Sequence, residues 1–342
     1  MSNFIRIGVL GAGTWGMALA RMLSNAGHDV TVWSAIEKEI DDLSQTRRHP
    51  NLPDIELPEQ LGYTKDIQAV CENKSILLFA VPSPFVRSTA KKAAPYIKDD
   101  QIIVDVAKGI EPTTLFTMTQ IIEDELQNPT VKMVALSGPT HAEEVIRDLP
   151  TTIVSASKDA QAAEFVQKVF TTGCMRVYTN DDVLGVELCG ALKNVIALAS
   201  GIATGLGCGD NAKAALITRG IAEISRLGTA IGCRETTFGG LAGIGDLIVT
   251  ATSMHSRNNR CGILLGQGIP VEEATRQVGM VVEGLNALPA ALSLSKKYNV
   301  EMPIVETVDA VVSGRVEISE AIRTLMSRDL KSELRNSAFD NN

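Results

Sequence analysis

Short apolar runs rich in valine and isoleucine recur through the first half of the chain, and segments with helical spacing separate them. Such runs are typical of strands that are buried on both faces. They lie at residues 4–10, 28–33, 75–82, 101–109, 132–139 and 151–157. Helical spacing covers residues 36–43, 85–96 and 115–126. This alternation predicts βαβ units, and therefore an α/β domain with a doubly wound, mainly parallel sheet.

The hydrophobic pattern changes character after residues 175–180. Asn180, Asp181 and Asp182 resemble a helix cap, and the apolar positions that follow recur with a period of about 3.6 residues. Helical patterns punctuated by glycine and proline cover residues 182–204, 211–232, 257–266, 271–278, 283–298, 304–313 and 317–327. We expect no further strand, so the second half should be all-α.

We place the boundary between the two predicted domains within this change of pattern. The α/β domain then covers residues 1–185, and the helical domain covers residues 186–330. The polar tail at residues 331–342 lacks apolar periodicity, and we expect it to be frayed.

The composition is that of a globular chain. Its 342 residues are 45% hydrophobic, which is enough for two packed cores. A formal net charge of −8 argues against nucleic acid or an anionic membrane as a partner, since neither attracts a negative surface. The longest apolar stretch of the second half, at residues 195–206, is interrupted by polar residues and glycines and is too short to insert stably in a membrane. We expect a cytoplasmic protein whose anionic ligands are held by local cations.

The possible metal ligands are too dispersed to predict a metal site. Six cysteines are scattered without C-x-x-C spacing, and the four histidines, at positions 28, 49, 141 and 255, show no H-x-x-x-H spacing. We therefore expect no metal, and we interpret the cysteines as reduced thiols.

The segment after the first strand carries the most informative motif. Gly11, Gly13 and Gly16 form the spacing G-x-G-x-x-G directly between an apolar strand and a helix rich in alanine and leucine. The first glycine permits a tight turn, the second lets a pyrophosphate approach the backbone, and the third lets helix and strand pack closely. The helix N-terminus attracts the negative charge. A Rossmann-type dinucleotide site is the favoured interpretation, and a plain glycine-rich turn is the alternative.

Further candidates follow the ends of predicted strands, where ligands bind in open parallel sheets. Lys108 follows one such strand and precedes Gly109, although a lysine at a strand end is more commonly just solvated. The segment 137–141 closes another strand and offers backbone N–H groups and a hydroxyl at the start of a helix. A simple turn is the alternative for that segment.

Lys193 lies in a predicted helix whose other positions are almost all small or apolar. Desolvation lowers the pKa of an ammonium towards neutrality, which suits a group that transfers a proton when an alcohol becomes a carbonyl. Asn194 beside it could orient another polar group. From periodicity alone, a lysine that reaches from the helix edge to water is an equal alternative.

Acidic and basic residues follow close together in one downstream segment, residues 246–258. Asp246 and Thr250 lie one turn apart if that segment is helical, and Asp246 could pair with a catalytic ammonium. Arg257 and Asn258 stand near a helix start, where a guanidinium could bind phosphate in bidentate fashion. A helix-capping role for Asp246 and an exposed polar loop around Arg257 are the alternatives.

Several blocks of the chain, taken in order, resemble one enzyme family. They are GAGTWG (11–16), AKG (107–109), SGPTHAEEV (137–145), GALKNVIALASGI (190–202), NAKAALITRG (211–220), LAGIGDLIVTATS (241–253), SRNNRCG (256–262), VVEG (281–284) and MPI (302–304). Together they span nearly the whole chain and are similar to the bacterial NAD(P)-dependent glycerol-3-phosphate dehydrogenases. The resemblance implies reversible hydride transfer between sn-glycerol 3-phosphate and dihydroxyacetone phosphate, which supplies glycerophospholipid biosynthesis.

The resemblance also assigns catalytic roles, position by position. Lys193 matches the general acid or base at the C2 oxygen, and Asp246 matches the group that tunes and positions that ammonium. Lys108 matches a second lysine, which polarises the carbonyl and touches both substrate and cofactor.

Binding roles follow in the same way. The residues matched to the substrate are Lys108, Gly138, Thr140, Lys193, Asp246, Ser256, Arg257 and Asn258, the last three of which include the phosphate contacts. The residues matched to the cofactor are Gly11, Gly13, Thr14, Trp15, Gly16, Arg48, Lys108, Ala142, Arg257, Val281 and Glu283.

The choice between NAD and NADP stays open on the sequence. The run 33–37 after the second strand, WSAIE, has neither the acidic residue expected at the strand end for NAD nor the cation expected for NADP. Arg47 or Arg48, which match a basic position in the family, could still reach an adenosine 2′-phosphate. We therefore expect both cofactors to be used.

Two other functions fit parts of the pattern. A 3-hydroxyacid dehydrogenase or a ketopantoate reductase would share the two-domain layout and the helical lysine, but its substrate lacks the phosphate that Arg257 would bind. A non-catalytic NAD(P)-binding redox sensor would keep the fold, but the presence of Lys108, Lys193 and Asp246 argues against it. The family further implies a small-molecule substrate and a homodimer formed through the helical half.

Overall fold

The first half of the protein is built on one eight-stranded sheet, in the order β3-β2-β1-β4-β5-β6-β7-β8. The computed structural model describes residues 4–330, so the tail expected to be frayed, 331–342, lies outside the described residues. The strands are β1 (Arg6–Leu10), β2 (Asp29–Trp33), β3 (Gly62–Thr64), β4 (Ile76–Phe79), β5 (Ile102–Asp105), β6 (Lys132–Ser137), β7 (Thr151–Ala156) and β8 (Met175–Asn180).

Strands β1 to β6 all run parallel and have the order of a doubly wound dinucleotide-binding sheet. Strand β7 pairs with β6 in the antiparallel direction, and β8 pairs parallel with β7, so the last two strands extend the sheet with reversed polarity. The predicted α/β, mainly parallel, Rossmann-type architecture is confirmed.

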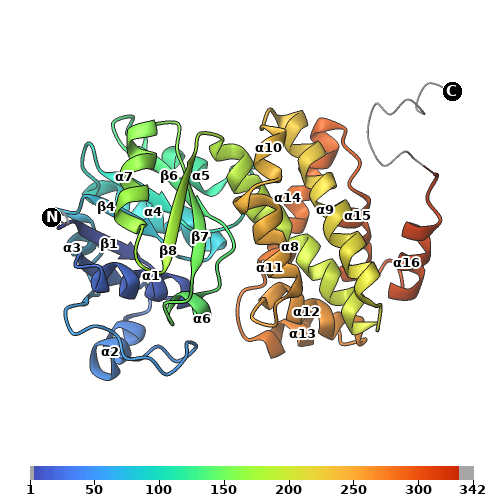
Figure 1. The fold of residues 1–342 in the computed structure, drawn as a ribbon, viewed down its shortest axis with the longest axis horizontal. Coiled ribbons are helices and arrows are strands. Elements are labelled where there is room, and N and C mark those ends of the chain that lie inside the picture. The colour runs from blue at the N-terminus through green and yellow to red at the C-terminus, as the bar shows by residue number, and fades with distance from the viewer. Residues whose placement is uncertain (1–3, 331–342) are drawn as a thin grey trace.

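Helices cover both faces of this sheet (Figure 1). Successive side chains of a strand point to opposite faces, so Ile76 and Leu78 of β4 belong to one hydrophobic cluster, and Leu77 and Phe79 to another. The first cluster includes residues of α1 (Thr14–Asn25), α2 (Glu37–Thr46), α6 (Ala142–Val145) and α7 (Ala160–Phe170). The second includes residues of α3 (Ile67–Cys71), α4 (Val86–Ala93) and α5 (Met118–Leu126), and the short 3₁₀ turns η1 (Ser83–Phe85) and η2 (Ala94–Tyr96) flank α4.

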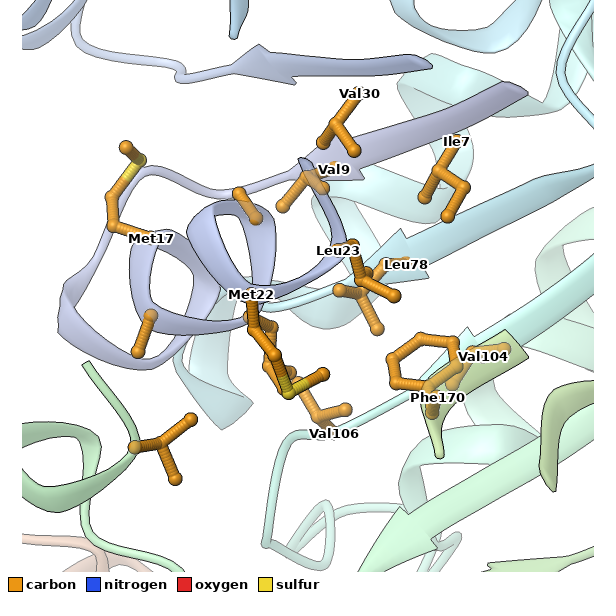
Figure 2. Packing of buried hydrophobic residues seen from close by; sticks show 14 of the residues in the cluster. Ile7, Val9, Met17, Met22, Leu23, Val30, Leu78, Val104, Val106 and Phe170 are labelled. Carbon is orange, nitrogen blue, oxygen red and sulfur yellow. The ribbon is translucent and has the colours of Figure 1, made fainter. Parts of the chain in front are cut away.

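Figure 2 shows the first of these clusters, in which α1 lies over the sheet. Leu23 of α1, Leu78 of β4 and Phe170 of α7 belong to it and are completely buried. This packing holds α1 against the sheet, and at the start of the helix Gly16 approaches Gly11 and Ala80 closely.

The second half is helical, as predicted, and no strand follows β8 within residues 4–330. Its helices are α8 (Val183–Gly205), α9 (Asp210–Ile231), α10 (Glu235–Phe238), α11 (Asp246–Thr252), α12 (Arg257–Gly266), α13 (Val271–Val278), α14 (Glu283–Tyr298), α15 (Pro303–Val312) and α16 (Ile318–Met326). A π-helical turn, η3 (Leu241–Gly245), precedes α11. Figure 1 shows these helices as a second body beside the sheet, with α8 running through its middle.

By length and composition alone, helix α8 is long and apolar enough to cross a membrane. The stretch 195–206 considered in the sequence analysis is too short to do so. However, 89% of the most apolar window of α8 is buried inside the protein. The neighbouring helices supply the apolar surroundings, because Leu192, Ile196 and Leu198 belong to the same cluster as residues of α9, α12 and α14. α8 is therefore the core helix of this half.

Helices α8 and α12 approach so closely that glycine is required at their contact. A Cβ added at Gly201 of α8 would lie 2.2 Å from the carbonyl oxygen of Asn259, and one added at Gly262 of α12 would lie 2.2 Å from that of Leu198. The two backbones therefore touch without intervening side chains. This contact holds the start of α12, with Arg257, beside the middle of α8, with Lys193.

Some elements differ from the sequence pattern. Strand β3 and helix α7 were not expected, and the predicted strands at 75–82 and 101–109 end earlier, at Phe79 and Asp105. The paired register of β5 with β6 stops at Asp105. Residues 106–109 thus leave the sheet as a loop, and this loop carries Lys108.

Candidate active site

The glycine motif forms a turn that is tight on the side facing the protein and open on the other side. Gly11 has φ +125°, and a Cβ there would lie 2.7 Å from the backbone of Ala80. A Cβ at Gly16 would lie 2.3 Å from the Gly11 carbonyl oxygen, so this glycine lets α1 pack on the turn. At Gly13, by contrast, a Cβ would meet nothing within 4 Å. This open face, at the N-terminus of α1, fits the pyrophosphate of a dinucleotide.

A cleft of about 240 Å³ extends from this turn to the helical half. From the first half, the predicted site residues that line it are Gly13, Thr14, Trp15, Lys108, Thr140 and Ala142. From the second half, they are Lys193, Ser256, Arg257, Asn258, Val281 and Glu283. Residues from distant parts of the sequence thus meet in one cleft beyond the carboxyl ends of the strands.

One carboxylate joins two lysines at the base of the cleft. Asp246 Oδ1 lies 2.7 Å from Lys193 Nζ, and Asp246 Oδ2 lies 2.6 Å from Lys108 Nζ. The Asp246 side chain is 1% exposed and that of Lys193 is 4% exposed, whereas Lys108 is 17% exposed. The carboxylate is therefore shielded from solvent, and the two ammonium groups lie between it and the cleft.

Further hydrogen bonds fix both ammonium groups. Lys193 donates to the Thr250 hydroxyl, which itself donates to the carbonyl oxygen of Asp246. Lys108 donates to the carbonyl oxygen of Gly138 as well as to Asp246. An ammonium group has three donors, so each lysine keeps one N–H beyond these two bonds.

Burial lowers the pKa of Lys193 to about 8. The nearby charge of Lys108 acts in the same direction, and Asp246 opposes both. An amine with this pKa exchanges its proton near neutral pH, which an ordinary solvated lysine does not.

The position of Asp246 depends on the turn that precedes it. Gly243 in η3 has non-helical backbone angles, and a Cβ there would lie 2.1 Å from the carbonyl oxygen of Phe238. This π-helical turn places Asp246 at the first position of α11, where the helix dipole favours a negative charge. The predicted one-turn spacing of Asp246 and Thr250 on a helix is confirmed.

A second cationic group, Arg257, lies at the start of α12. The Ser256 hydroxyl caps this helix by accepting a hydrogen bond from the Asn259 N–H at 3.2 Å. Burial lowers the pKa of Arg257, while Glu283 and Glu143 raise it. A guanidinium stays charged across the physiological range, so the cleft holds a fixed cation at a helix N-terminus, the usual geometry for binding an anion.

Two side chains connect the elements around the cleft. The Asn258 side-chain amide donates to Asn194 Oδ1 at 3.0 Å, and Asn258 Oδ1 accepts from the Gly284 N–H at 2.8 Å, which joins α8, α12 and α14. Glu283 accepts hydrogen bonds from the Ser83 N–H and hydroxyl, at 3.1 and 2.6 Å. This second contact links the helical half directly to the segment after β4.

Several predicted residues lie outside the cleft lining. Gly11, Gly16 and Gly138 support the loops that form it, and Asp246 lies behind the lysines. Arg48 is not brought to the cleft: its guanidinium pairs with Asp54.

The structure adds lining residues that sequence reasoning did not select. The segment 80–82 lines the cleft; the sequence pattern placed it inside the predicted strand 75–82, but the strand ends at Phe79, so these residues follow its carboxyl end. His255 also lines it, and its ring centroid lies 5.7 Å from that of His141, which belongs to the candidate segment 137–141. No sequence pattern pairs these two histidines, because they belong to different halves.

Comparison with known proteins identifies similar sequences and folds. Residues 6–163 match the N-terminal part, and residues 182–323 the C-terminal part, of the family described as NAD-dependent glycerol-3-phosphate dehydrogenase. The chain is 64% identical over 333 residues to a glycerol-3-phosphate dehydrogenase [NAD(P)+] of Lactobacillus delbrueckii subsp. bulgaricus, an alignment that covers 96% of this chain and 99% of the relative.

Solved structures extend the comparison. A glycerol-3-phosphate dehydrogenase from Coxiella burnetii superimposes with a TM-score of 0.91 at 36% identity, over 95% of this chain and 99% of that one. A ketopantoate reductase family protein from Ralstonia eutropha has a TM-score of 0.63 at 15% identity, over 93% and 100% of the two chains, and shares the fold alone.

Proposed function

This chain belongs to the family of NAD-dependent glycerol-3-phosphate dehydrogenases, and we propose that it interconverts sn-glycerol 3-phosphate and dihydroxyacetone phosphate with NAD or NADP. The observation that carries the proposal is the carboxylate of Asp246 between the ammonium groups of Lys193 and Lys108, in a cleft that also contains the guanidinium of Arg257. The three cations suit a phosphorylated substrate whose C2 oxygen gains and loses a proton.

In this proposal Lys193 exchanges the proton at the C2 oxygen. During oxidation the neutral amine accepts the hydroxyl proton, and during reduction the ammonium donates it. The pKa of about 8 keeps both forms populated near neutral pH. Asp246 and Thr250 accept two of the three N–H donors of the Lys193 ammonium. The third N–H is therefore left for the substrate.

Lys108 stabilises negative charge on the same oxygen. Its ammonium is held by Asp246 and by the Gly138 carbonyl, and it lies at the cleft surface on the loop after β5. Donors fixed before the reaction stabilise developing charge without having to reorganise. Lys108 thus polarises the carbonyl in reduction and stabilises the alkoxide in oxidation.

We assign the substrate phosphate to the start of α12. Arg257 supplies a guanidinium, Ser256 has a hydroxyl that can donate, and Asn258 has a second amide N–H beyond its bond to Asn194. Holding the remote phosphate orients C2 towards the lysines, which lowers the entropic part of the barrier.

The cofactor lies in this proposal along the glycine turn, with Gly13, Thr14 and Trp15 on one side and Val281 and Glu283 on the other. When bound, a nicotinamide cofactor supplies or accepts the hydride at C2. Glu283 and its bond to Ser83 join the two walls of the cleft, so this pair helps to exclude water from the reaction.

The test is to follow nicotinamide absorbance while the purified protein reduces dihydroxyacetone phosphate, and to compare the variant Lys193→Ala. We expect the variant to lose about 10²- to 10⁴-fold in kcat, because the acid and base of the reaction is removed. Its affinity for NADH, measured by fluorescence, should stay within about twofold of the wild-type value.

Lys168→Ala is the matched control, since Lys168 lies on α7 with a side chain that is 75% exposed. It should keep the wild-type kcat. If Lys193→Ala retains more than about a tenth of the wild-type kcat, Lys193 does not have the proposed role.

Family membership favours this function over the alternatives. The ketopantoate reductase likeness shows only a shared fold, and that substrate class would leave Arg257 without a phosphate partner. A redox sensor would need no buried Lys–Asp–Lys arrangement.

We also propose that the protein acts in the cytoplasm, supplies glycerol 3-phosphate for glycerophospholipid biosynthesis, and forms a homodimer through the helical half. These assignments rest on the family resemblance. Light scattering should then give about twice the chain mass of 36.5 kDa. Cells depleted of the protein should depend on supplied glycerol 3-phosphate.

A further inference from the structure

The end of strand β2 lies beside the glycine turn. Gly11 donates its N–H to the carbonyl oxygen of Trp33, the last residue of β2, at 2.8 Å. Ser34 follows immediately and is 6% exposed. In dinucleotide-binding folds the residue at this strand end contacts the adenosine ribose, and an acidic residue there binds the 2′-hydroxyl of NAD. Ser34 itself has no charge with which to discriminate.

A carboxylate reaches this position from the next helix. Ser34 donates its hydroxyl proton to Glu39 Oε2 at 2.6 Å and accepts the N–H of Ile36 at 3.1 Å. These two bonds fix both partners of the Ser34–Glu39 pair at the strand end. Among the described residues, Oε1 of Glu39 accepts no hydrogen bond, and the side chain is half-buried.

His49 places this pair next to the cofactor turn. Its Nε2 lies 3.1 Å from the carbonyl oxygen of Ala12, between Gly11 and Gly13, and the charge of Glu39 acts on its ring. Burial is the largest influence and lowers the pKa of His49, so the ring is mainly neutral at pH 7. His49 therefore adds no full positive charge to balance Glu39.

The cations that could hold a 2′-phosphate are engaged by other carboxylates. Arg47 donates to Glu59 at 2.8 Å and to the carbonyl oxygen of Leu57, and Arg48 pairs with Asp54. Lys65 donates to Asp41 at 2.8 Å.

Lys38 is exposed and lies between two acidic residues, Glu37 and Glu39, in the first turn of α2. It is the remaining cation of this helix that could meet a 2′-phosphate. If it did, NADPH would bind as tightly as NADH, and this outcome is part of the test below.

We propose that Glu39, oriented by Ser34, makes this protein select NAD over NADP. The proposal rests on the dinucleotide site of the proposed function, and it narrows the expectation that both NAD and NADP are used. A carboxylate at the ribose accepts a hydrogen bond from the 2′-hydroxyl of NAD. The same charge repels the 2′-phosphate of NADP, which is a dianion near neutral pH. Glu39 thus supplies, from α2, the acidic group that the strand end lacks in sequence.

The test is equilibrium binding of NADH and NADPH without substrate, read by nicotinamide fluorescence. Wild-type protein should bind NADH at least about tenfold more tightly than NADPH, as expected for a charge-assisted bond gained and a repulsion avoided. Glu39→Gln should tighten NADPH binding and weaken NADH binding, so that the two dissociation constants differ by less than about threefold.

Two sets of variants serve as controls. The first tests whether Ser34 must orient Glu39, and the second tests whether removing any negative charge from α2 has the same effect on cofactor selectivity. Ser34→Ala frees Glu39 and should reduce the selectivity, whereas Ser34→Thr keeps the hydroxyl and should restore it. Asp42→Asn removes the same charge from an exposed position of α2 and should leave the selectivity unchanged.

Equal binding of both cofactors by the wild-type protein would overturn the proposal, as would unchanged selectivity in Glu39→Gln. Binding is measured without turnover, so it is independent of the reaction. Selective binding without turnover of dihydroxyacetone phosphate would contradict the proposed function alone, and turnover with equal binding would contradict the selectivity alone.

Discussion

The position of Lys193 shows how one residue can carry two opposing influences. Burial favours the neutral amine, whereas the carboxylate of Asp246 at 2.7 Å favours the ammonium. Burial prevails, and the resulting pKa of about 8 lies close to neutral pH. A solvated lysine would remain protonated, and a buried lysine without Asp246 would be neutral over a wider pH range.

This balance predicts the pH dependence of the reaction. Oxidation of glycerol 3-phosphate requires the neutral amine, so its kcat/KM should rise with pH and level off above about 8. Reduction requires the ammonium, so its kcat/KM should fall through the same region. Asp246→Asn removes the charge that raises the pKa of Lys193, so the midpoint should move to lower pH. If kcat/KM does not change with pH across this range, or if the midpoint of the pH profile is unchanged in Asp246→Asn, the assignment of Lys193 is contradicted.

The apolar pattern could suggest that Lys193 is buried, and the family resemblance named Asp246 as its partner, but periodicity and spacing alone could not show that the two residues meet. The apolar neighbours of Lys193 indicated desolvation, yet a solvated lysine at the helix edge was an equal alternative. The structure decides between them because Asp246, from a segment far along the chain, lies against Lys193. Glu39 is a similar case: nothing in the run 33–37 shows that the following turn brings Glu39 back to Ser34.

At the scale of helices, the close contact of α8 and α12 positions the two cationic regions of the cleft. Gly201→Ala tests this contact, because the new Cβ would meet the Asn259 carbonyl oxygen at 2.2 Å. Overpacking of this kind should lower the free energy of unfolding by about 1–3 kcal/mol, measured by urea denaturation. Alanine is the better helix former by roughly 0.5–1 kcal/mol, so any loss must come from packing.

Gly173→Ala is the matched control for that substitution, since a Cβ at Gly173 would meet nothing within 4 Å. It should leave the unfolding midpoint unchanged. If Gly201→Ala is as stable as the wild-type protein, the two helices do not require the close approach.

Elements with strong local signals were predicted well, and those defined by their neighbours were not. Strand β4 and the first three residues of β5 are continuous apolar runs, so burial on both faces could be inferred. Strand β3 has only three residues, all half-buried, and exists because β2 pairs with it. The reversed direction of β7 and the π-helical turn before α11 have no local sequence signature, because they depend on which elements pack around them.

For the whole molecule, the central feature is that the cleft is completed only by both halves. Lys108 comes from the loop after β5, while Lys193, Asp246 and Arg257 come from three helices of the second half. The bond between Glu283 and Ser83 joins the two halves at this cleft. Neither half alone would therefore contain the glycine turn, the buried lysine and the arginine that the proposed function requires.

The most direct measurement compares kcat/KM for dihydroxyacetone phosphate and unphosphorylated dihydroxyacetone in the wild-type protein and in Arg257→Ala, at saturating cofactor. If Arg257 binds the phosphate and the lysines act at C2, the variant should lose about 10²-fold or more on the phosphorylated substrate. Its activity on dihydroxyacetone should stay within about twofold of the wild-type value. An equal loss on both substrates, or no loss on either, would contradict this division of roles.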